Sequence, residues 1–267
     1  MPHHLTGLLL MALALTPADA GHASPGSSDV LRITVLFNNV EHRPGLEAGW
    51  GFSCLLQGLE RTILFDTGGD GEVLLSNMRR LGVEPRVVDT VVLSHIHGDH
   101  VGGLPAFLAE HGEVEVIMPE SFPQSFREAV IGRGGRVRTV DGGGKLMERV
   151  YTTGELGHGL PEQSLVVDTA KGLVVITGCA HPGIDRIAQE AVRLTGRPIH
   201  LLMGGFHLGG VGQHEIRAII ERLREIGVEK VAPSHCTGER AMQLFREAWG
   251  VDYVEGGLGA VIEVPMR

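Results

Sequence analysis

The sequence predicts one α/β domain with four layers, an αββα sandwich of two mixed β-sheets with helices on the outer faces. Of the 267 residues, 43% are hydrophobic, which is enough to build a large core. Strand-like segments occur both in hairpins and in alternation with helical segments. This mixture favours two packed sheets over a simple parallel sheet.

The first half of the chain alternates between the two kinds of segment. Segments 51–57 and 62–65 are expected to form a hairpin, and an amphipathic helix over 72–81 ends at Gly82. Ser121 is a candidate N-cap for a later helix. In chain order we expect strands at 30–37, 51–57, 62–65, 87–93, 114–118 and 136–140, and helices at 72–81, 104–110 and 121–131.

The second half of the chain also contains both strand-like and helical segments. A hairpin is expected through residues 170–172, and the triplet 142–144 (Gly-Gly-Gly) is typical of a flexible turn. We expect strands at 163–169, 173–177, 199–203, 229–232 and 260–264, and helices at 184–194, 214–226 and 239–249.

The N-terminus has the pattern of an export signal. Residues 5–15 are almost wholly apolar but too short to span a bilayer, and Ala18 and Ala20 fit a cleavage site. We therefore expect a signal peptide over 1–20, a flexible mature start over 21–29, and one domain over 30–267. The protein would be exported, in the periplasm, without stable membrane insertion after the leader is removed. Because the leader lacks Lys and Arg, a packed or disordered arm is the alternative.

Net charge limits the classes of partner, and cysteine content limits the possible disulfide bonds. The net charge of −9, with only three lysines, argues against nucleic-acid binding and favours a small-molecule substrate. The oligomeric state is left open. The three cysteines do not form a disulfide framework. Cys54 is expected to be a core thiol, whereas Cys179 and Cys236 sit beside histidines and are metal-site neighbours or a pair.

Residues 94–100 read Ser-His-Ile-His-Gly-Asp-His and follow an apolar strand. Three imidazoles and one carboxylate at this density suit Zn²⁺, Fe²⁺ or Mn²⁺. His95 and His97 are two residues apart and can point the same way from an extended backbone. Asp99 and His100 can then turn toward a second, neighbouring position. The alternative, a solvated polar turn, does not explain so many ligand-type side chains in six residues.

Polar residues also follow four other apolar strands. Because ligands gather at the carboxyl ends of strands in such sheets, we expect these residues to converge on one edge. The residues concerned are Asp66 after 63–65, Cys179 and His181 after 174–176, His207 after 201–203, and His235 and Cys236 after 231–233.

With these motifs in place, the chain resembles the metallo-β-lactamase superfamily over residues 30–267. The resemblance rests on the His-x-His-x-Asp-His run at 95–100, on Phe65-Asp66-Thr67-Gly68 and on the later strand-end histidines. Within the superfamily it is most similar to the dihydropterin-ribofuranosylaminobenzene-phosphate synthase-like branch. The segments that support the branch are 95–104, 162–165, 172–184, 204–208 and 234–238.

The resemblance implies roles for individual residues. His95 and His97 would bind a first metal ion. Asp99, His100 and His235 would bind a second ion. Asp66 would support the cluster loop through hydrogen bonds, since a metal-bound histidine needs its other nitrogen held.

The chain departs from the family pattern in its remaining ligands. Most relatives place an Asp that bridges both metals where this chain has Cys179. His181 is a candidate ligand, and His158 is a candidate for an earlier histidine of the pattern, although its glycine-rich surroundings also suit an ordinary loop. Without a bridging carboxylate, one metal ion and two are both open. His207 is a candidate proton donor, substrate contact, further ligand or structural histidine.

The expected chemistry is hydrolysis of a small ester or phosphoester by a metal-activated water, with zinc as the preferred metal and iron or manganese as alternatives. Asp99 would ligate the metal and orient the water, and His207 would protonate the leaving group. Two other classes remain open. One is a pterin-linked transferase or synthase, as the branch name implies, and the other is a non-catalytic metal-binding or sensing protein.

Overall fold

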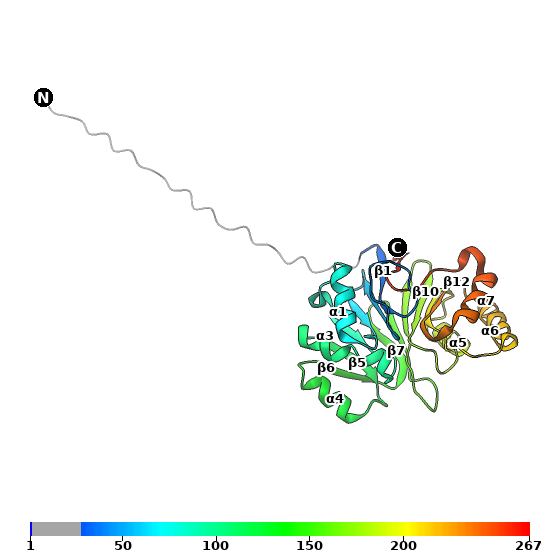
Figure 1. Ribbon diagram of the computed structural model, residues 1–267, viewed down its shortest axis with the longest axis horizontal. Helices are drawn as coiled ribbons and strands as arrows, with labels where there is room; N and C mark the ends of the chain where they lie inside the picture. Colours follow the sequence, from blue (N-terminus) through cyan, green and yellow to red (C-terminus); the bar gives the residue numbers. More distant parts are fainter. Residues whose placement is uncertain (2–27) are drawn as a thin grey trace.

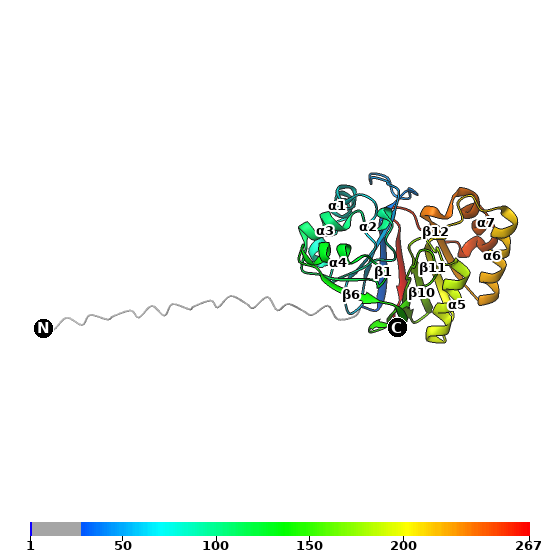
Figure 2. The ribbon, with the colours of Figure 1, turned by 90° about the horizontal axis from the view of Figure 1, so that it is seen from below.

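Two β-sheets pack face to face, and helices cover the outer face of each (Figures 1 and 2). This computed structural model describes Met1 and residues 28–267. The predicted αββα sandwich is confirmed. The expected signal peptide and most of the flexible start after it lie outside the described residues. No helix among the described residues is long and apolar enough to cross a membrane.

The first sheet has seven strands in the order β13-β1-β2-β3-β4-β5-β6. Pairing is antiparallel from β13 to β3 and parallel from β3 to β6, so the sheet is mixed. The strands are β1 (Val30–Asn38), β2 (Phe52–Gln57), β3 (Ile63–Phe65), β4 (Thr90–Val92), β5 (Glu115–Pro119), β6 (Arg136–Val140) and β13 (Val261–Pro265).

The second sheet has six strands in the order β12-β11-β10-β9-β8-β7. Its parallel part is β10 to β12, and the other pairs are antiparallel. The strands are β7 (Gly142–Met147), β8 (Val150–Gly154), β9 (Leu165–Thr169), β10 (Gly172–Thr177), β11 (Ile199–Gly205) and β12 (Lys230–Ser234).

The helices divide between the outer faces. The first sheet carries α1 (Gly71–Arg80), α2 (Gly98–Val101), α3 (Leu104–Glu110) and α4 (Gln124–Ile131), and the second carries α5 (Ile184–Thr195), α6 (Gln213–Ile226) and α7 (Glu239–Trp249). Short 3₁₀ turns lie at Pro85–Val87, His235–Thr237 and Gly250–Asp252. Local sequence explains the helix ends: Asp70 caps α1 by accepting from two backbone N–H groups, and α6 ends at Gly227 in the left-handed region.

Three apolar clusters fill the spaces between these layers. The central cluster joins the facing sides of the two sheets and includes Phe65 and Val92 from one sheet and Ile176 and Met203 from the other. A second lies under α5, α6 and α7, and a third under α1 and α3. Because β4 and β10 are buried along their whole length, the loops that follow them start from fixed positions.

Three local expectations were wrong. Ser121 does not cap α4, because the helix begins at Gln124 after Pro123, and the Ser121 backbone N–H instead donates to Glu155. The Gly142–Gly144 triplet is the start of β7 and not a flexible turn, because it pairs with β8. The strand β8 was missed, and so was the one-turn helix α2.

Candidate metal centre

The carboxyl ends of five strands meet at one edge of the sandwich. In the first sheet β3 and β4 end side by side, with Phe65 opposite Val92. In the second sheet β10, β11 and β12 also run parallel, so their ends lie together. The polar side chains that follow these strands are therefore brought to a common point, as the sequence indicated.

The side chains form three overlapping groups whose ligand-type atoms lie within 4.8 Å of one another. Cys179 belongs to all three groups. The first group is His95, Cys179 and His181; the second is Asp99, His100, Cys179 and His235; the third is Cys179, His207 and Cys236. The position where family members carry a bridging Asp is thus occupied by a thiol between the first two groups.

In the first group, Nδ1 of each histidine is hydrogen-bonded, and Nε2 is left to face the neighbouring side chains. The Nδ1 of His95 lies 2.9 Å from the Ser94 hydroxyl, whereas its buried Nε2 has no hydrogen-bond partner. The His95 ring centroid is 4.6 Å from that of His181. The exposed His97 ring completes the cluster, 4.9 Å from His95 and 5.0 Å from His181.

Asp66 supports both groups from beneath. Its fully buried carboxylate accepts hydrogen bonds from the Ser94 backbone N–H and hydroxyl, both at 2.7 Å, and from His100 Nδ1 at 2.7 Å. Through Ser94 it also fixes the orientation of His95. Burial raises the Asp66 pKa to about 7, against the opposing effects of His95 and Ser94.

Glu162 holds the loop after β10 in the same way. One carboxylate oxygen accepts from the Thr177 hydroxyl and from the backbone N–H groups of Cys179 and Ala180, at 2.8–3.0 Å. The other accepts from the His181 backbone N–H and from His181 Nδ1. Although burial acts to raise the Glu162 pKa, these hydrogen bonds and the nearby His95 hold it well below its usual range.

The second group places two imidazole nitrogens against each other. The Nε2 atoms of His100 and His235 are 3.3 Å apart. Nδ1 of His100 bonds to Asp66, and Nδ1 of His235 bonds to the Asn39 side-chain oxygen at 2.8 Å, so the Nε2 atoms are the ones that face each other. Burial, and then the neighbouring His235, lowers the His100 pKa to about 4, so this ring is neutral near pH 7. Asp99 lies 3.3 Å from His235.

Backbone strain concentrates at this edge. Five non-glycine residues among those described have positive φ, and four of them carry or adjoin candidate ligands: Asp66 (53°), Ala180 (58°), His207 (51°) and His235 (51°). Such conformations cost free energy and persist only where the surrounding structure enforces them, which occurs most often at functional sites. Gly178 also permits a close approach, because a Cβ there would lie 2.1 Å from the Ser94 hydroxyl.

The third group lies on the open side of the site. The His207 ring is exposed and its centroid is 4.5 Å from His181. A hydrogen bond with Cys236 raises the His207 pKa, whereas hydrogen bonding from Cys179 lowers the Cys236 pKa to about 5. All three cysteines are free thiols, and Cys54 is buried in the core as expected.

The structure brings together every candidate ligand except His158. That histidine is exposed on the loop between β8 and β9 and belongs to none of the three groups. Sequence reasoning missed the positioning roles of Ser94, Glu162 and Asn39. Glu162 opened one of the segments that suggested the branch, but nothing in the sequence shows that it bonds to residues 15 to 19 positions away.

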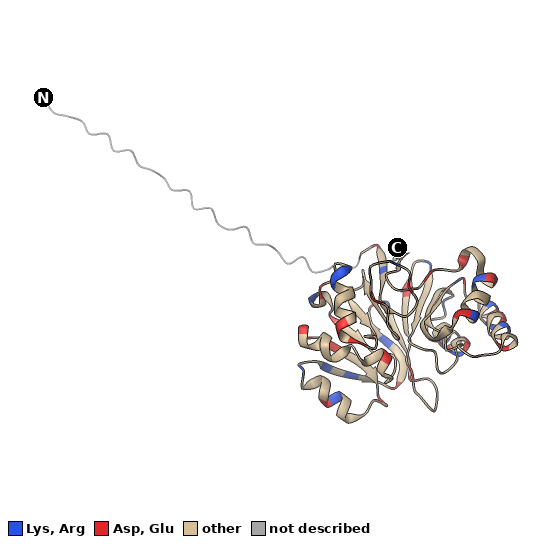
Figure 3. Cartoon of the chain, viewed as in Figure 1, with Lys and Arg blue, Asp and Glu red and all other residues tan. Residues whose placement is uncertain are grey.

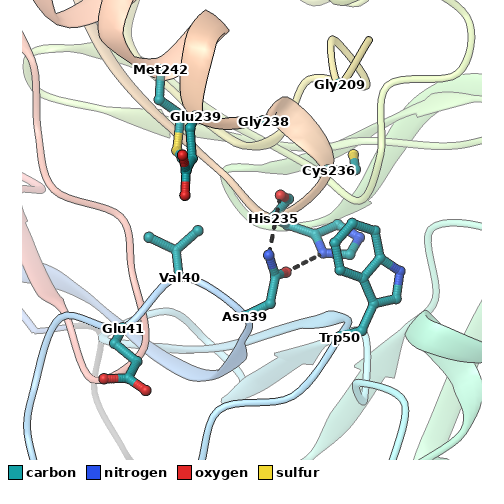
Figure 4. A pocket seen from close by; sticks show the side chains of 10 residues that line it. All are labelled: Asn39, Val40, Glu41, Trp50, Gly209, His235, Cys236, Gly238, Glu239 and Met242. Atoms are coloured by element: carbon teal, nitrogen blue, oxygen red, sulfur yellow. Dashed lines mark hydrogen bonds between the residues drawn. The ribbon is translucent and has the colours of Figure 1, made fainter.

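A cavity of ≈ 430 Å³ opens beside the second group (Figure 4). Figure 4 shows the Asn39 side chain bonded to His235 and the Trp50 ring lying against the same imidazole, with centroids 4.9 Å apart. The cavity is lined by Asn39, Val40, Glu41, Trp50, Gly209, His235, Cys236, Gly238, Glu239 and Met242.

The donor set fits a divalent metal ion. The buried Nε2 of His95 lacks a partner, and such an atom costs free energy unless a cation or donor meets it. The Nε2 atoms of His100 and His235 face each other at 3.3 Å with the Cys179 sulfur beside them, an arrangement that a shared cation would stabilise. Imidazole, carboxylate and thiolate together are typical ligands of zinc and similar ions.

Comparisons with known proteins agree with this geometry. The chain is 28% identical to the 7,8-dihydropterin-6-methyl-4-(beta-D-ribofuranosyl)-aminobenzene-5'-phosphate synthase of Methanocaldococcus jannaschii, over 80% of this chain and 89% of that protein. A solved metal-dependent hydrolase of the beta-lactamase superfamily is 30% identical, with a TM-score of 0.75 over 88% of this chain and 99% of its own. The short form of human tRNase Z shares the fold alone, at 15% identity and a TM-score of 0.59 over 88% of this chain and 99% of its own.

The family model described as the metallo-beta-lactamase superfamily matches residues 51–235. This match covers strands β2 to β12 and the candidate ligands from His95 to His235. The relationship predicted from the His-x-His-x-Asp-His run is confirmed, and the chain belongs to the metallo-β-lactamase superfamily.

Proposed function

We propose that this protein is a metal-dependent hydrolase that uses a metal-activated water on a small ester or phosphoester. The observation that carries the proposal is the convergence of histidine, carboxylate and thiol groups whose inner atoms are fixed by Asp66, Glu162 and Asn39. Metal-binding histidines in proteins are oriented in this way. Zinc is the metal that we propose, with iron or manganese as alternatives.

Two metal positions share the thiol. His95, His97 and His181 would hold one ion, and Asp99, His100 and His235 would hold the other. Cys179 lies between the two sets, within 4.8 Å of both. A bound ion lowers the pKa of a coordinated water to about 7 and polarises the oxygen of the group under attack.

The chain's own residues supply the proton handling. Asp99 is the least buried member of the second group, and its carboxylate would accept a hydrogen bond from the attacking water and orient it. His207 is exposed next to His181 and would donate a proton to the leaving group.

Two other functions are kept as outcomes of the test. The name of the methanogen relative suggests a synthase that transfers a pterin-linked group. A metal-binding or sensing protein without turnover would use the same ligands. Nucleic acid is not the substrate that we propose, because the net charge is −9 and Figure 3 shows Lys and Arg interspersed with Asp and Glu.

Metal analysis combined with a substrate screen tests the proposal. The full chain is purified without chelator, its bound metal is counted by mass spectrometry, and turnover of generic aryl esters and phosphodiesters is measured with and without EDTA. We expect bound metal and chelator-sensitive turnover. His97→Ala and Asp99→Ala should each abolish activity, because each removes a proposed ligand.

The matched control is His214→Ala, which removes an exposed histidine at the start of α6. It should keep both metal content and activity. Full activity in His97→Ala or Asp99→Ala would overturn the mechanism. Bound metal without turnover of any ester or phosphodiester would favour the synthase or the sensing function.

A further inference from the structure

The Trp50 side chain lies where a substrate can contact it, and it does not pack into the protein core. Its side chain is 61% exposed, although tryptophan is a large and mostly apolar residue. One side of the ring meets His235 and the ring forms part of the cavity wall (Figure 4). An exposed aromatic ring beside a candidate metal ligand offers a flat surface for stacking.

The backbone around Trp50 packs closely against the loop that carries the metal cluster. Gly51 has φ of +144°, and a Cβ there would lie 2.2 Å from the Asp99 carbonyl oxygen. A Cβ on Gly69 would lie 2.7 Å from the Trp50 carbonyl oxygen. This packing places Trp50 beside the candidate ligands.

The cavity wall is acidic. Glu41 and Glu239 line it from opposite sides, and no Lys or Arg is among its lining residues. The nearest arginine of the adjoining cavity, Arg246, is already engaged, because it pairs with Glu255 at 2.8 Å and lies over the Tyr253 ring. A second anionic group on a substrate would meet two carboxylates and no compensating positive charge here.

We propose that this cavity selects substrates whose non-reacting part combines a flat aromatic group with a positive charge. Trp50 would stack on the flat group through dispersion and cation–π attraction, and Glu41 and Glu239 would balance its charge. The reacting ester lies toward His235, at the end of the cavity that meets the second ligand group. This inference rests on the proposed hydrolase function and names its substrate class.

Matched esters that differ only in remote charge test the selectivity. Three 4-nitrophenyl benzoates carry CH₂N(CH₃)₃⁺, CH₂C(CH₃)₃ or CH₂CO₂⁻ at the para position, and kcat/KM is divided by each ester's hydroxide-catalysed rate. We expect kcat/KM for the cation to exceed that for the anion by about tenfold or more, as a cation–π contact and a favourable charge together would give. Equal values, or a preference for the anion, would overturn the proposal.

Variants locate the effect in the cavity. Glu41→Gln combined with Glu239→Gln should lower the cation-to-anion ratio, and Trp50→Ala should reduce kcat/KM for all three benzoates more than for 4-nitrophenyl acetate. Glu247→Gln is the matched control, because Glu247 lies on α7 outside the cavity lining and bonds to Gln243. If that control lowers the ratio as much as the double variant does, the selectivity does not come from this cavity.

A binding measurement separates failure of this inference from failure of the hydrolase function. The chain has two tryptophans, and the second, Trp249, is the buried last residue of α7. Benzyltrimethylammonium should therefore quench the fluorescence of Trp50, and phenylacetate should not. Trp50→Phe should remove the signal. Quenching by the cation without ester turnover would support the cation-selective cavity and contradict the hydrolase function. Ester turnover with equal quenching by the cation and the anion would support the hydrolase function and contradict the selectivity of the cavity.

Discussion

The two sheets contribute to the candidate metal centre in different ways. The first sheet supplies its ligands from one continuous segment, residues 95–100, placed by the end of β4 and the short helix α2. The second supplies them from three separate strand ends, with Cys179 and His181 after β10, His207 after β11 and His235 after β12. One half of the site is therefore a local motif, and the other exists only in the folded protein.

The supports of the two halves differ as well. Asp66 orients side chains of the cluster segment, through Ser94 and His100. The second sheet needs Glu162 for the loop after β10 and Asn39 for His235. Two of these supports are buried carboxylates and the third is a neutral amide. Since hydrogen bonds with a charged partner are about twice as strong as neutral ones, the supports should differ in effect.

The largest effect is expected at Cys179, where the two halves meet. Cys179→Ala should lower activity by more than the 10–100-fold that is typical when a ligand's hydrogen-bond partner is lost, because it removes a group shared by both metal positions. Metal per chain should fall in parallel. In cobalt-loaded protein, the thiolate-to-cobalt absorption band should disappear with Cys179→Ala and with Cys179→Asp.

Cys54→Ala is the control for this experiment, since Cys54 is a core thiol away from the site. It should keep the cobalt band. Cys179→Asp should restore part of the activity lost in Cys179→Ala, because a carboxylate can also bridge two ions. Persistence of the thiolate band in Cys179→Ala would show that Cys236 is the sulfur ligand.

Asp66→Asn should weaken both metal positions at once. The amide cannot accept from all the donors that face the carboxylate, so His100 and Ser94 lose part of their support. We expect metal affinity to fall by roughly 10–100-fold, measured by competition with a chromophoric chelator. A loss of about 1–3 kcal/mol in unfolding free energy is expected for buried donors left unpaired.

Asp89→Asn is a matched control, because Asp89 adjoins a strand of the first sheet as Asp66 does and accepts a backbone N–H, from Thr62, but lies on an exposed surface. It should leave metal affinity unchanged. If Asp66→Asn affects only one of two bound ions, Asp66 does not support both metal positions.

Glu162→Gln should affect the metal position that uses His181 more than the other. The Glu162 carboxylate accepts five hydrogen bonds, and an amide nitrogen turned toward His181 would oppose the two donors there. We expect this position to weaken by roughly 10-fold or more while the position of His100 and His235 keeps its ion. Metal counting under dilution measures this, with Glu155→Gln, which removes a more exposed carboxylate, as the control. Loss of both ions to the same extent would show that Glu162 acts through the Cys179 loop and not through His181.

The sequence was sufficient for the contiguous half of the site and for most elements. The His-x-His-x-Asp-His run and the apolar strand before it fix their own geometry, because ligand spacing and strand direction are local properties. The strand β8 was missed since Val150–Gly154 is short and follows the glycine-rich start of β7. Glycines suggest a turn unless the pairing of the neighbouring strand is known.

The supports could not be predicted because they act across the fold. Asn39 bonds to a histidine 196 positions away, and its neighbours in sequence carry no sign of this. Trp50 falls between glycines in a loop, where only the structure shows that it meets His235. Residues 162–165 are among the segments that support the resemblance to the branch. However, the burial of the Glu162 carboxylate and its five hydrogen-bond donors depend on how the loop packs, and the segment alone does not show them.

The smallest effect is expected at Asn39, the neutral support. Asn39→Ala should lower metal affinity at the position of His235 by about 2–10-fold, since a neutral hydrogen bond contributes roughly 0.5–1.5 kcal/mol. Asn39→Asp should instead raise affinity there, because a carboxylate bonded to Nδ1 makes the imidazole a stronger ligand. Both are measured by chelator competition against wild type, with unfolding temperature as a check on folding. Equal metal affinities in Asn39→Ala and Asn39→Asp would show that the His235 ring is fixed by Trp50 packing and by the strained backbone. In that case, the charge of the residue bonded to a histidine is not what distinguishes the two halves of the site.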